Sequence, residues 1–326
     1  ILLAPITFVG AVGNVLSIKT FFRLGISDGV NLSLLSLAAS DLFYLITALI
    51  TAISLMLLGV EELSGYKVRF ALDPEAVFMT STHSGSGFYA ISMLVTTFIT
   101  VVRCLAVAQP LKYRNLISRQ TTTIIISLFT VLSVTSAVLT LAFLGILHQF
   151  DSKTNTTSSS LWLSPQQAII KDVIFGIRDV ILPLTSQIIV GVCVVIMARY
   201  LRKASSFRKT LSSNIAMDTI TSISLIAEPL TRNNNPASAK VAGKEIQVVQ
   251  QMLLIAVVYS LCNMPKVVFN MTQIILPEFY RGGRYSALYS TFNIVRELIQ
   301  SVNASVTIFI YWKYNSKFRN HFVLQH

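Results

Sequence analysis

The sequence predicts an all-α membrane protein, a bundle of seven spanning helices followed by a short amphipathic C-terminal helix. Of its 326 residues, 53% are hydrophobic and only 12% are charged, and the mean hydropathy is +0.66. Soluble domains carry about 25% charged residues. The apolar residues also form continuous runs long enough to cross a bilayer, which takes about 20 helical residues. Because these runs do not alternate with a period of two, a β-barrel is not expected.

The runs are predicted to form one domain over residues 1–326. In order, the expected spans are 1–22, 31–58, 79–107, 121–147, 172–200, 246–276 and 285–311, with the C-terminal helix at 313–322. The chain has no internal repeat, which disfavours transporters built from duplicated halves. Since Ile1 already lies in the first span, the sequence is expected to lack an outer tail.

The net charge of +12 is distributed as in a membrane protein, and a nucleic-acid partner is not expected. Arg and Lys gather in the loops after spans 1, 3 and 5 and at the C-terminal end, whereas the other loops carry mixed charges. The positive-inside rule therefore predicts an outside N-terminus and a cytoplasmic C-terminus. A glycosylation sequon at Asn155, in the loop after span 4, agrees with an outer face.

The small residues of span 3 form a G-x-G-x-x-A pattern, Gly85-Ser86-Gly87-Phe88-Tyr89-Ala90. This pattern occurs in dinucleotide-binding proteins, but there it follows a strand and precedes an acidic residue about 20 positions later. Neither condition holds here, so the glycines are predicted to let span 3 pack closely against a neighbouring helix.

Six motifs follow one another in order, each in or beside a different part of the bundle. They are Asn14, "SLAASDL" with Asp41, "VRCLAVAQPLKY" with Arg103 and Pro110, Pro183, Cys262-x-x-Pro265, and Tyr311 followed seven residues later by Phe318. In this order they resemble the class A, rhodopsin-like G-protein-coupled receptors over the whole chain. The stretches "ILPEFYRGGRYSALY" and "FIYWKYNSKFR" are similar to those of molluscan chemosensory-type receptors.

The resemblance implies a plasma-membrane receptor that senses an extracellular small molecule or short peptide and activates a heterotrimeric G protein. Arrestin and the lipid bilayer are the other expected partners, and no enzymatic activity is expected. A neuropeptide-type receptor of the same class and a seven-span transporter remain alternatives. A retinal-binding light sensor would need a lysine in span 7 for its Schiff base, and residues 285–311 contain none.

For the G-protein-coupling switch, the resemblance implies Arg103, Glu245, Tyr311 and Pro110. Val102 and Cys104 stand where the family's Asp-Arg-Tyr motif has its acid and its tyrosine, so the usual ion pair beside Arg103 cannot form. Glu245 matches the acid at the inner end of span 6. Alternatively, Arg103 extends toward lipid headgroups. Asn14, Pro183, Cys262 and Pro265 match structural positions.

For a sodium site, the resemblance implies Asp41, Ser92, Asn303 and Thr307, whose oxygen atoms suit a hard cation. Thr307 and Ile308 replace the Asn-Pro of the family's NPxxY motif. A polar packing network without a cation is the alternative.

For ligand binding, the resemblance implies Asp179, Lys266 and Glu297, with Arg178 and Phe175 beside them. Charges of both signs suit an amino acid, an amine or a short peptide. An internal ion pair of Lys266 with Asp179 or with Glu297 is an equally weighted alternative. The chain also departs from the family, because Asn263 replaces the tryptophan two residues before Pro265. In addition, Phe78 stands where a disulfide cysteine is usual.

Overall fold

The structure is a computed structural model that describes most of the chain. It covers residues 2–25, 29–65, 67, 68, 70, 72–108, 118–142, 144–151, 156–164, 167–222, 236–280, 282–314 and 318–320. Within these ranges, side chains are described except at 144–151, 156–163, 167–169, 171, 204–222 and 236–247.

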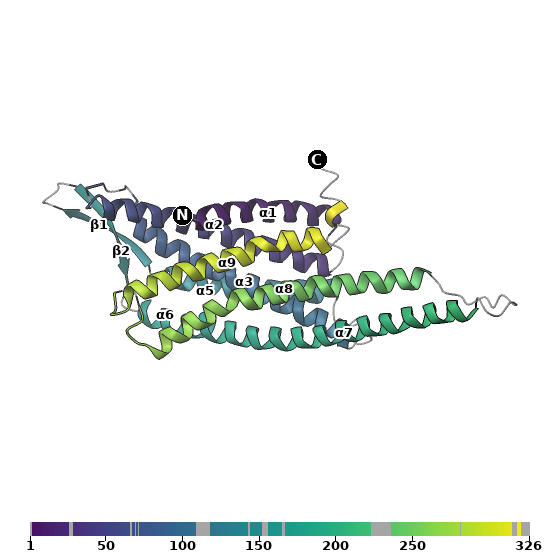
Figure 1. The fold of residues 1–326 in the computed structure, drawn as a ribbon. Helices are drawn as coiled ribbons and strands as arrows, with labels where there is room; N and C mark the ends of the chain where they lie inside the picture. Colours follow the sequence, from purple (N-terminus) through teal and green to yellow (C-terminus); the bar gives the residue numbers. More distant parts are fainter. Residues whose placement is uncertain are drawn as a thin grey trace.

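The described part of the chain forms a bundle of long helices that run roughly side by side (Figure 1). Their bounds are α1 Leu3–Leu24, α2 Gly29–Leu63, α3 Pro74–Ala108, α5 Arg119–Ala142, α7 Leu182–Ser222, α8 Pro236–Ile275 and α9 Ser286–Tyr314. The fifth span begins earlier, with α6 Gln167–Ile174 and the π-helix η1 Phe175–Ile181, which continue into α7. The predicted membrane bundle is therefore confirmed.

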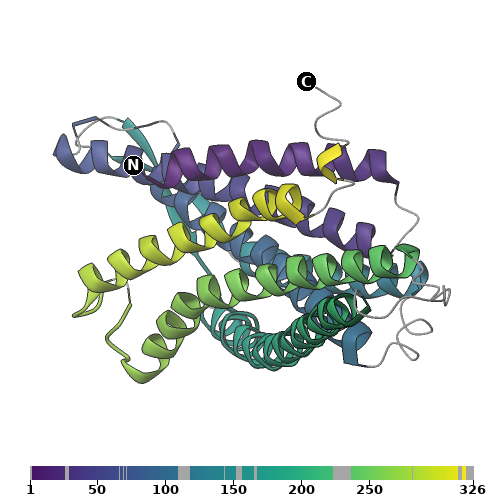
Figure 2. The same ribbon diagram turned by 45° about the vertical axis from the view of Figure 1, so that its right-hand side comes forward.

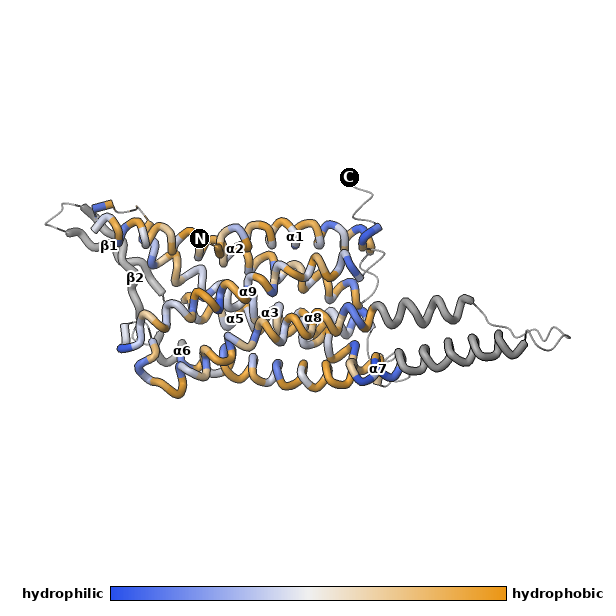
Figure 3. The backbone as a smooth tube through the Cα atoms, viewed as in Figure 1, coloured by the Kyte–Doolittle hydropathy of each residue, from blue (hydrophilic) through white to orange (hydrophobic). Residues whose placement is uncertain are grey.

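Six of these helical segments are long and apolar enough to cross a membrane. Hydrophobic residues predominate along the middle of the bundle, and hydrophilic residues are more frequent toward the helix ends (Figure 3). The seventh segment, α9, has 29 residues but carries buried Arg296, Glu297 and Gln300. Its place in the bundle follows from its packing against α1, α2 and α8.

Helix α3 lies at the centre and packs against α2, α5, α7 and α8. Helix α8 lies between α7 and α9 in both ribbon views (Figures 1 and 2). The chain begins at the end of the bundle that carries the β-hairpin, and α9 ends at the opposite end (Figure 1). We call these the hairpin end and the Arg103 end, because the last turns of α3 hold Arg103.

Several helix boundaries have a local cause in the sequence. Before α3, the Asp73 carboxylate accepts the backbone N–H of Glu75 at 2.9 Å, and Pro74 takes the first helical position, where no N–H partner is needed. Before α5, the Ser118 hydroxyl accepts the N–H of Thr121 at 3.1 Å. Helix α1 is followed by Gly25, whose φ of 85° would strain a residue with a Cβ.

The predicted end of span 4 at residue 147 is wrong, because α5 ends at Ala142 and residues 144–147 belong to a strand. Strand β1 (Leu144–Asp151) pairs antiparallel with β2 (Thr156–Leu163). The letters "LGIL" continue the apolar run of the helix, and hydrophobicity alone does not separate a short apolar strand from a helix. The hairpin was not predicted, and the bundle itself remains all-helical.

The predicted C-terminal helix falls mostly outside the described residues. Residues 313 and 314 belong to α9, and residues 318–320 are helical. Phe318 is fully buried, with its ring centroid 5.4 Å from that of Phe21 and 5.7 Å from that of Tyr311. The chain after α9 is therefore held against α1 by an aromatic cluster.

The glycines of α3 lie at close helix contacts, as predicted. A Cβ on Gly85 would lie 2.8 Å from the hydroxyl of Thr47 in α2. A Cβ on Gly87 would lie 2.8 Å from the Cβ of Ala137 in α5. The close approach on two sides of α3 explains why small residues occur here.

Replacing Gly87 with leucine is expected to destabilise the purified protein by about 1–3 kcal/mol, because the side chain would push α5 away from α3. Gly191→Leu is the matched control, since a Cβ at Gly191 in α7 would meet no atom of another described helix within 4 Å. Thermal unfolding in detergent measures the difference. Equal melting temperatures for the two variants would contradict close packing at Gly87.

Candidate functional site

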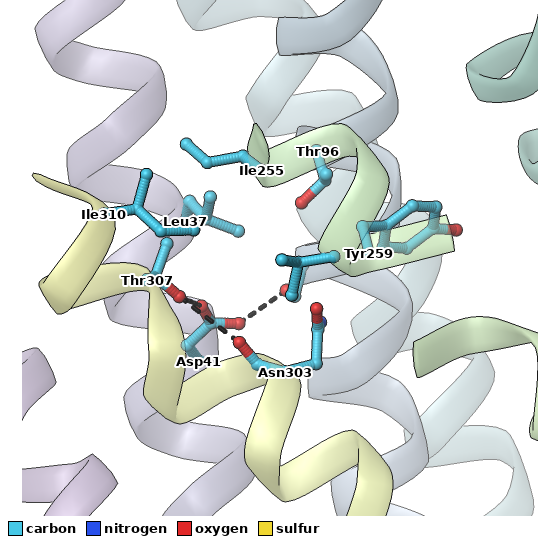
Figure 4. A pocket seen from close by; sticks show the side chains of 10 residues that line it. Leu37, Asp41, Thr96, Ile255, Tyr259, Asn303, Thr307 and Ile310 are labelled. Carbon is cyan, nitrogen blue, oxygen red and sulfur yellow. Dashed lines mark hydrogen bonds between the residues drawn. The ribbon is translucent and has the colours of Figure 1, made fainter. Parts of the chain in front are cut away.

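A small cavity inside the bundle brings together the four residues predicted to hold sodium (Figure 4). Asp41 comes from α2, Ser92 from α3, and Asn303 and Thr307 from α9. The Ser92 hydroxyl donates to Asp41 Oδ1 at 2.5 Å, and the Thr307 hydroxyl donates to Asp41 Oδ2 at 3.3 Å. The cavity has a volume of about 10 Å³, which is about the space that one water needs.

The Asp41 carboxylate is buried, with 2% of its surface exposed. Among the described side chains, no Lys, Arg or His forms an ion pair with it, and its hydrogen bonds come from neutral hydroxyl groups. An ionised carboxylate inside a membrane is costly without a cation or a proton. The cavity therefore offers the oxygen atoms that could coordinate a small cation, together with a carboxylate whose charge such a cation would balance.

A second polar region, toward the hairpin end, contains charged side chains from three segments. We call it the ionic cluster, and its members are Arg178, Asp179, Lys266, Arg296 and Glu297. Arg178 Nε and Nη2 donate to Asp179 Oδ2 at 3.2 and 2.9 Å. Lys266 Nζ lies 3.2 Å from Asp179 Oδ1. Asp179 therefore forms ion pairs with two cations. The sequence left open whether Lys266 pairs with Asp179 or with Glu297, and the structure contains the pair with Asp179.

On α9, Arg296 and Glu297 form the other half of the cluster. Arg296 Nη2 donates to Glu297 Oε1 at 2.7 Å, and the Tyr44 hydroxyl from α2 donates to Glu297 Oε2 at 3.0 Å. The Arg296 guanidinium lies over the ring of Phe269, 5.1 Å from its centroid. Glu297 thus pairs with its neighbour in sequence, and the expected alternative, a pair with Lys266, does not form among the described contacts.

Pro183 shapes the backbone beside the cluster. Proline has no N–H, so the carbonyl four residues earlier, that of Asp179, receives no helical hydrogen bond from it. The side-chain amide of Asn270 in α8 donates to this carbonyl instead. Just before Pro183 the chain forms η1, in which Leu182 N–H bonds to the Ile177 carbonyl, five residues back. Such π-turns often occur at functional sites.

A series of polar contacts leads from the cluster into the bundle. Lys266 Nζ lies 5.0 Å from the ring centroid of Tyr89. The Tyr89 hydroxyl donates to Asn263 Oδ1 at 3.4 Å, and Asn263 Nδ2 donates to Gln187 Oε1 at 3.4 Å. Asn263 is fully buried, so the residue that replaces the expected tryptophan links α3, α7 and α8 by hydrogen bonds.

Deeper in the bundle, a second set of hydroxyl groups reaches the Asp41 cavity. Thr97 donates to Ser186 at 3.1 Å, and Ser186 shares a hydrogen bond with the Tyr259 hydroxyl. Tyr259 also lines the Asp41 cavity. These contacts join α3, α7 and α8 beside the Asp41 cavity.

The predicted switch residues are described only in part. Arg103 is half-buried and lines a small hollow between α2 and α3, together with Gly29, Ser33 and Val102. Cys104 packs in an apolar cluster with Cys193 and Val249. The side chain of Glu245 lies outside the described part of the chain, as do Pro110 and the sequon residue Asn155. The predicted pair of Arg103 with Glu245 therefore stays a prediction.

The remaining predicted residues lie within the helices. Asn14 donates to the carbonyls of Gly10 at 3.0 Å and Ala304 at 2.9 Å, which ties α1 to α9. Tyr311 is fully buried, Cys262 is half-buried, and Pro265 lies inside α8. Phe175 is half-buried at the start of η1. No ion pair or ring contact of the described residues joins Phe175 to the ionic cluster.

Sequence reasoning missed several residues of these polar contacts, among them Tyr44, Tyr89, Gln187 and Asn270. Each is a polar residue within an apolar helix, and that feature was a usable signal, because buried polar groups require hydrogen-bond partners. The signal identifies such residues but not their partners, which come from other helices.

Comparison with protein families finds a match to the 7 transmembrane receptor (rhodopsin family) over residues 14–311. The match begins at Asn14 and ends at Tyr311, and it includes both polar sites. A comparison with curated proteins finds none that matches this chain.

Proposed function

Because the chain belongs to the rhodopsin family of seven-transmembrane receptors, we propose that it senses a charged small molecule or short peptide outside the cell and activates a heterotrimeric G protein inside it. Receptors of this family in general bind extracellular ligands and G proteins. The chemosensory role and the nature of the ligand are parts of the proposal. The similarity of the loop before span 7 to molluscan chemosensory-type receptors supports the former.

The ionic cluster is the observation that carries the ligand-binding part of the proposal. Five charged side chains, each nine-tenths or more buried, lie between η1, α8 and α9 toward the hairpin end. Charged groups inside a membrane are costly and usually functional. They also lie at the opposite end of the bundle from Arg103, as a receptor that connects two compartments requires.

The polar contacts between the two ends support a mechanism based on a population shift. A ligand that bonds to Lys266 or Asp179 would alter the forces between η1 and α8. Lys266 follows Pro265, where α8 lacks one internal hydrogen bond and bends more easily than an unbroken helix. Movement of α8 would then change the packing around Arg103, where we place the G-protein contact.

The topology and the other partners belong to the same proposal. The receptor is a multi-pass plasma-membrane protein with its N-terminus outside and its C-terminus in the cytoplasm, supported by the concentration of Arg and Lys in alternate loops. Arrestin binds the same cytoplasmic face, and Asn155 in the loop after α5 carries a glycan. Glu245 and Pro110 take part in coupling to the G protein.

The direct test is a ligand screen of the chain in cells, with a second-messenger readout and charged metabolites, amines and short peptides as ligands. A positive ligand should then stimulate nucleotide exchange on a purified G protein by the chain in lipid nanodiscs. Transport of the ligand across sealed vesicles without any nucleotide exchange would contradict the proposal and favour a seven-span transporter.

We also propose that the Asp41 cavity binds sodium. Asp41, Ser92, Asn303 and Thr307 would hold the ion through oxygen atoms, the ligands that hard cations prefer. The ion would supply the positive charge that the buried carboxylate lacks among its described neighbours. The cavity is small enough that one ion or one water fills it. A resting bundle held together by this ion is expected to be more stable with sodium than without it.

Exchanging sodium for a bulky organic cation is therefore expected to lower the melting temperature of the purified receptor. At a sodium concentration tenfold above Kd, the stabilisation is about 1.4 kcal/mol. Asp41→Asn should remove the sodium dependence, because the charge is lost. Ser40→Ala is the control, since among the described residues the Ser40 hydroxyl bonds within its own helix, to Ser36 and Leu37. If the wild type melts at the same temperature with sodium and with the organic cation, the sodium proposal is wrong and Asp41 belongs to a polar packing network.

A further inference from the structure

The ionic cluster has an excess of positive charge. Its cations are Arg178, Lys266 and Arg296, and its carboxylates are Asp179 and Glu297, which leaves one positive charge unbalanced. Arg178 and Lys266 lie on the same carboxylate, 2.9 and 3.2 Å from the Asp179 oxygens, and Arg296 belongs to α9, which packs against the helix of Lys266. In a buried site such an excess attracts an anion much more strongly than it would at the surface.

Two guanidinium nitrogens of the cluster have unused hydrogen-bonding capacity. Arg178 bonds to Asp179 through Nε and Nη2, and its Nη1 is buried without a partner among the described atoms. Arg296 bonds to Glu297 through Nη2, and its Nε is likewise buried without a partner. Buried donors normally have an acceptor, so this arrangement favours a ligand that brings acceptor oxygens.

The carboxylates, in contrast, each already have a cation beside them. Asp179 Oδ2 accepts from Arg178, and its Oδ1, which accepts no hydrogen bond among the described atoms, lies 3.2 Å from Lys266 Nζ. Glu297 accepts from Arg296 through Oε1 and from the Tyr44 hydroxyl through Oε2. An amine ligand would have to displace one of these cations and would add to the positive charge. The cluster therefore disfavours amines, one of the ligand classes that the sequence left open.

We infer that the ligand binds through an oxyanion, such as a carboxylate or a phosphate, held by Arg178, Lys266 and Arg296. Planar guanidinium groups bond to such oxygens in pairs and at fixed angles, which adds directional specificity to the charge attraction. This inference rests on the proposed function and narrows its ligand to small organic acids, acidic amino acids or acidic peptides.

The cluster is closed in this structure, since none of its charged side chains is more than 10% exposed. On the side of Arg296 it is covered by an aromatic group, in which Phe269 lies 5.6 Å from Phe279 and 5.3 Å from Tyr289 between ring centroids. Phe279 belongs to the connection between α8 and α9. Entry of an anion from this side would require these two helix ends to separate, which would connect binding to movement of α8.

The test uses the whole chain in lipid nanodiscs and follows its melting temperature with matched probes. Succinate and glutamate test the carboxylate, inorganic phosphate tests the phosphate, and succinamide and putrescine are the neutral and cationic controls. We expect a concentration-dependent stabilisation by at least one of the anions and none by the two controls. Equal stabilisation by succinate and succinamide, or stabilisation by putrescine alone, would overturn the inference.

Variants then locate the binding site. Arg178→Gln and Arg296→Gln should each weaken binding of the stabilising anion by about ten- to a hundredfold, the effect of losing a hydrogen bond to a charged group. Arg284→Gln is the control, because Arg284 is exposed in the loop before α9. If a Gln variant does not fold, Arg178→Lys and Arg296→Lys keep the charge and lose the unpartnered N–H, and the same weakening is expected. Unchanged affinity in the folded variants would place the anion elsewhere and overturn the inference.

Nucleotide exchange on a purified G protein, measured in the same nanodiscs, separates this inference from the receptor function. Activation by an amine with no response to any anion would overturn the oxyanion inference and support the receptor function. Anion binding that depends on Arg178 and Arg296 but never stimulates exchange would support the inference and contradict the receptor function.

Discussion

Arg103→Ala is expected to weaken activation of the G protein about ten- to hundredfold, while the receptor still inserts and reaches the cell surface. Arg103 is half-buried in the last turns of α3, at the end opposite the ionic cluster. Losing a charge-assisted hydrogen bond from Arg103 to the G protein would cost about 1.5–3 kcal/mol. This free energy corresponds to about a ten- to hundredfold weaker activation of the G protein. The helix itself needs no arginine there, because alanine favours helix formation.

Second-messenger output, normalised to surface expression, measures this effect. Arg119→Ala provides the control, since Arg119 is an exposed cation at the start of α5, also toward the Arg103 end. If Arg103→Ala activates the G protein with wild-type potency and amplitude, Arg103 is not the coupling residue. Its role would then be the alternative considered from the sequence, contact with lipid headgroups.

The second large effect is expected at Asp179. Asparagine in its place would leave the cations of Arg178 and Lys266 buried without a carboxylate, and breaking a buried ion pair on one side costs about 3–5 kcal/mol. We expect Asp179→Asn to unfold at a markedly lower temperature and to reach the cell surface poorly. Asp172→Asn is the matched control, because Asp172 is exposed on α6, in the same span.

The double variant Asp179→Asn/Lys266→Met separates pairing from a general intolerance of substitution. It removes the Lys266 charge together with the carboxylate, and a methionine of similar length fills the space of the lysine stem. Part of the lost stability should return, since only Arg178 then lacks its carboxylate, and the double-mutant cycle gives the coupling energy of the Lys266–Asp179 pair. If the two single effects simply add, the distance of 3.2 Å between Lys266 Nζ and Asp179 Oδ1 does not represent a stabilising interaction.

The sequence predicted the bundle well, because hydrophobic length is a strong constraint in a membrane. Span 7 was expected at 285–311, and α9 occupies Ser286–Tyr314. The end of span 4 was wrong, because the apolar residues of β1 continue the apolar run of α5 without a break. No local pattern in "LGIL" separates a strand from a helix.

The residues around the Asp41 cavity were predicted as a set, since the order of motifs fixed their helices and the resemblance fixed their positions. The contacts of Asn263 and Asn270 were not predicted. Pro183 indicates which carbonyl loses its helical partner, but not that Asn270 on another helix supplies the replacement. Partners between helices depend on helix rotation, which hydrophobicity determines only coarsely.

The π-helix η1 has a consequence for how positions in the fifth span are compared with those of other receptors. In a π-helix each backbone N–H bonds to the carbonyl five residues earlier, so a π-turn contains about one residue more than an α-turn. A count back from Pro183 that assumes 3.6 residues per turn therefore assigns residues before η1 to the wrong side of the helix. Phe175, which the resemblance implied beside the ligand-binding residues, stands at the start of η1. Alignments of this span need an inserted position on the N-terminal side of Pro183 before side chains in α6 are equated with those of a relative.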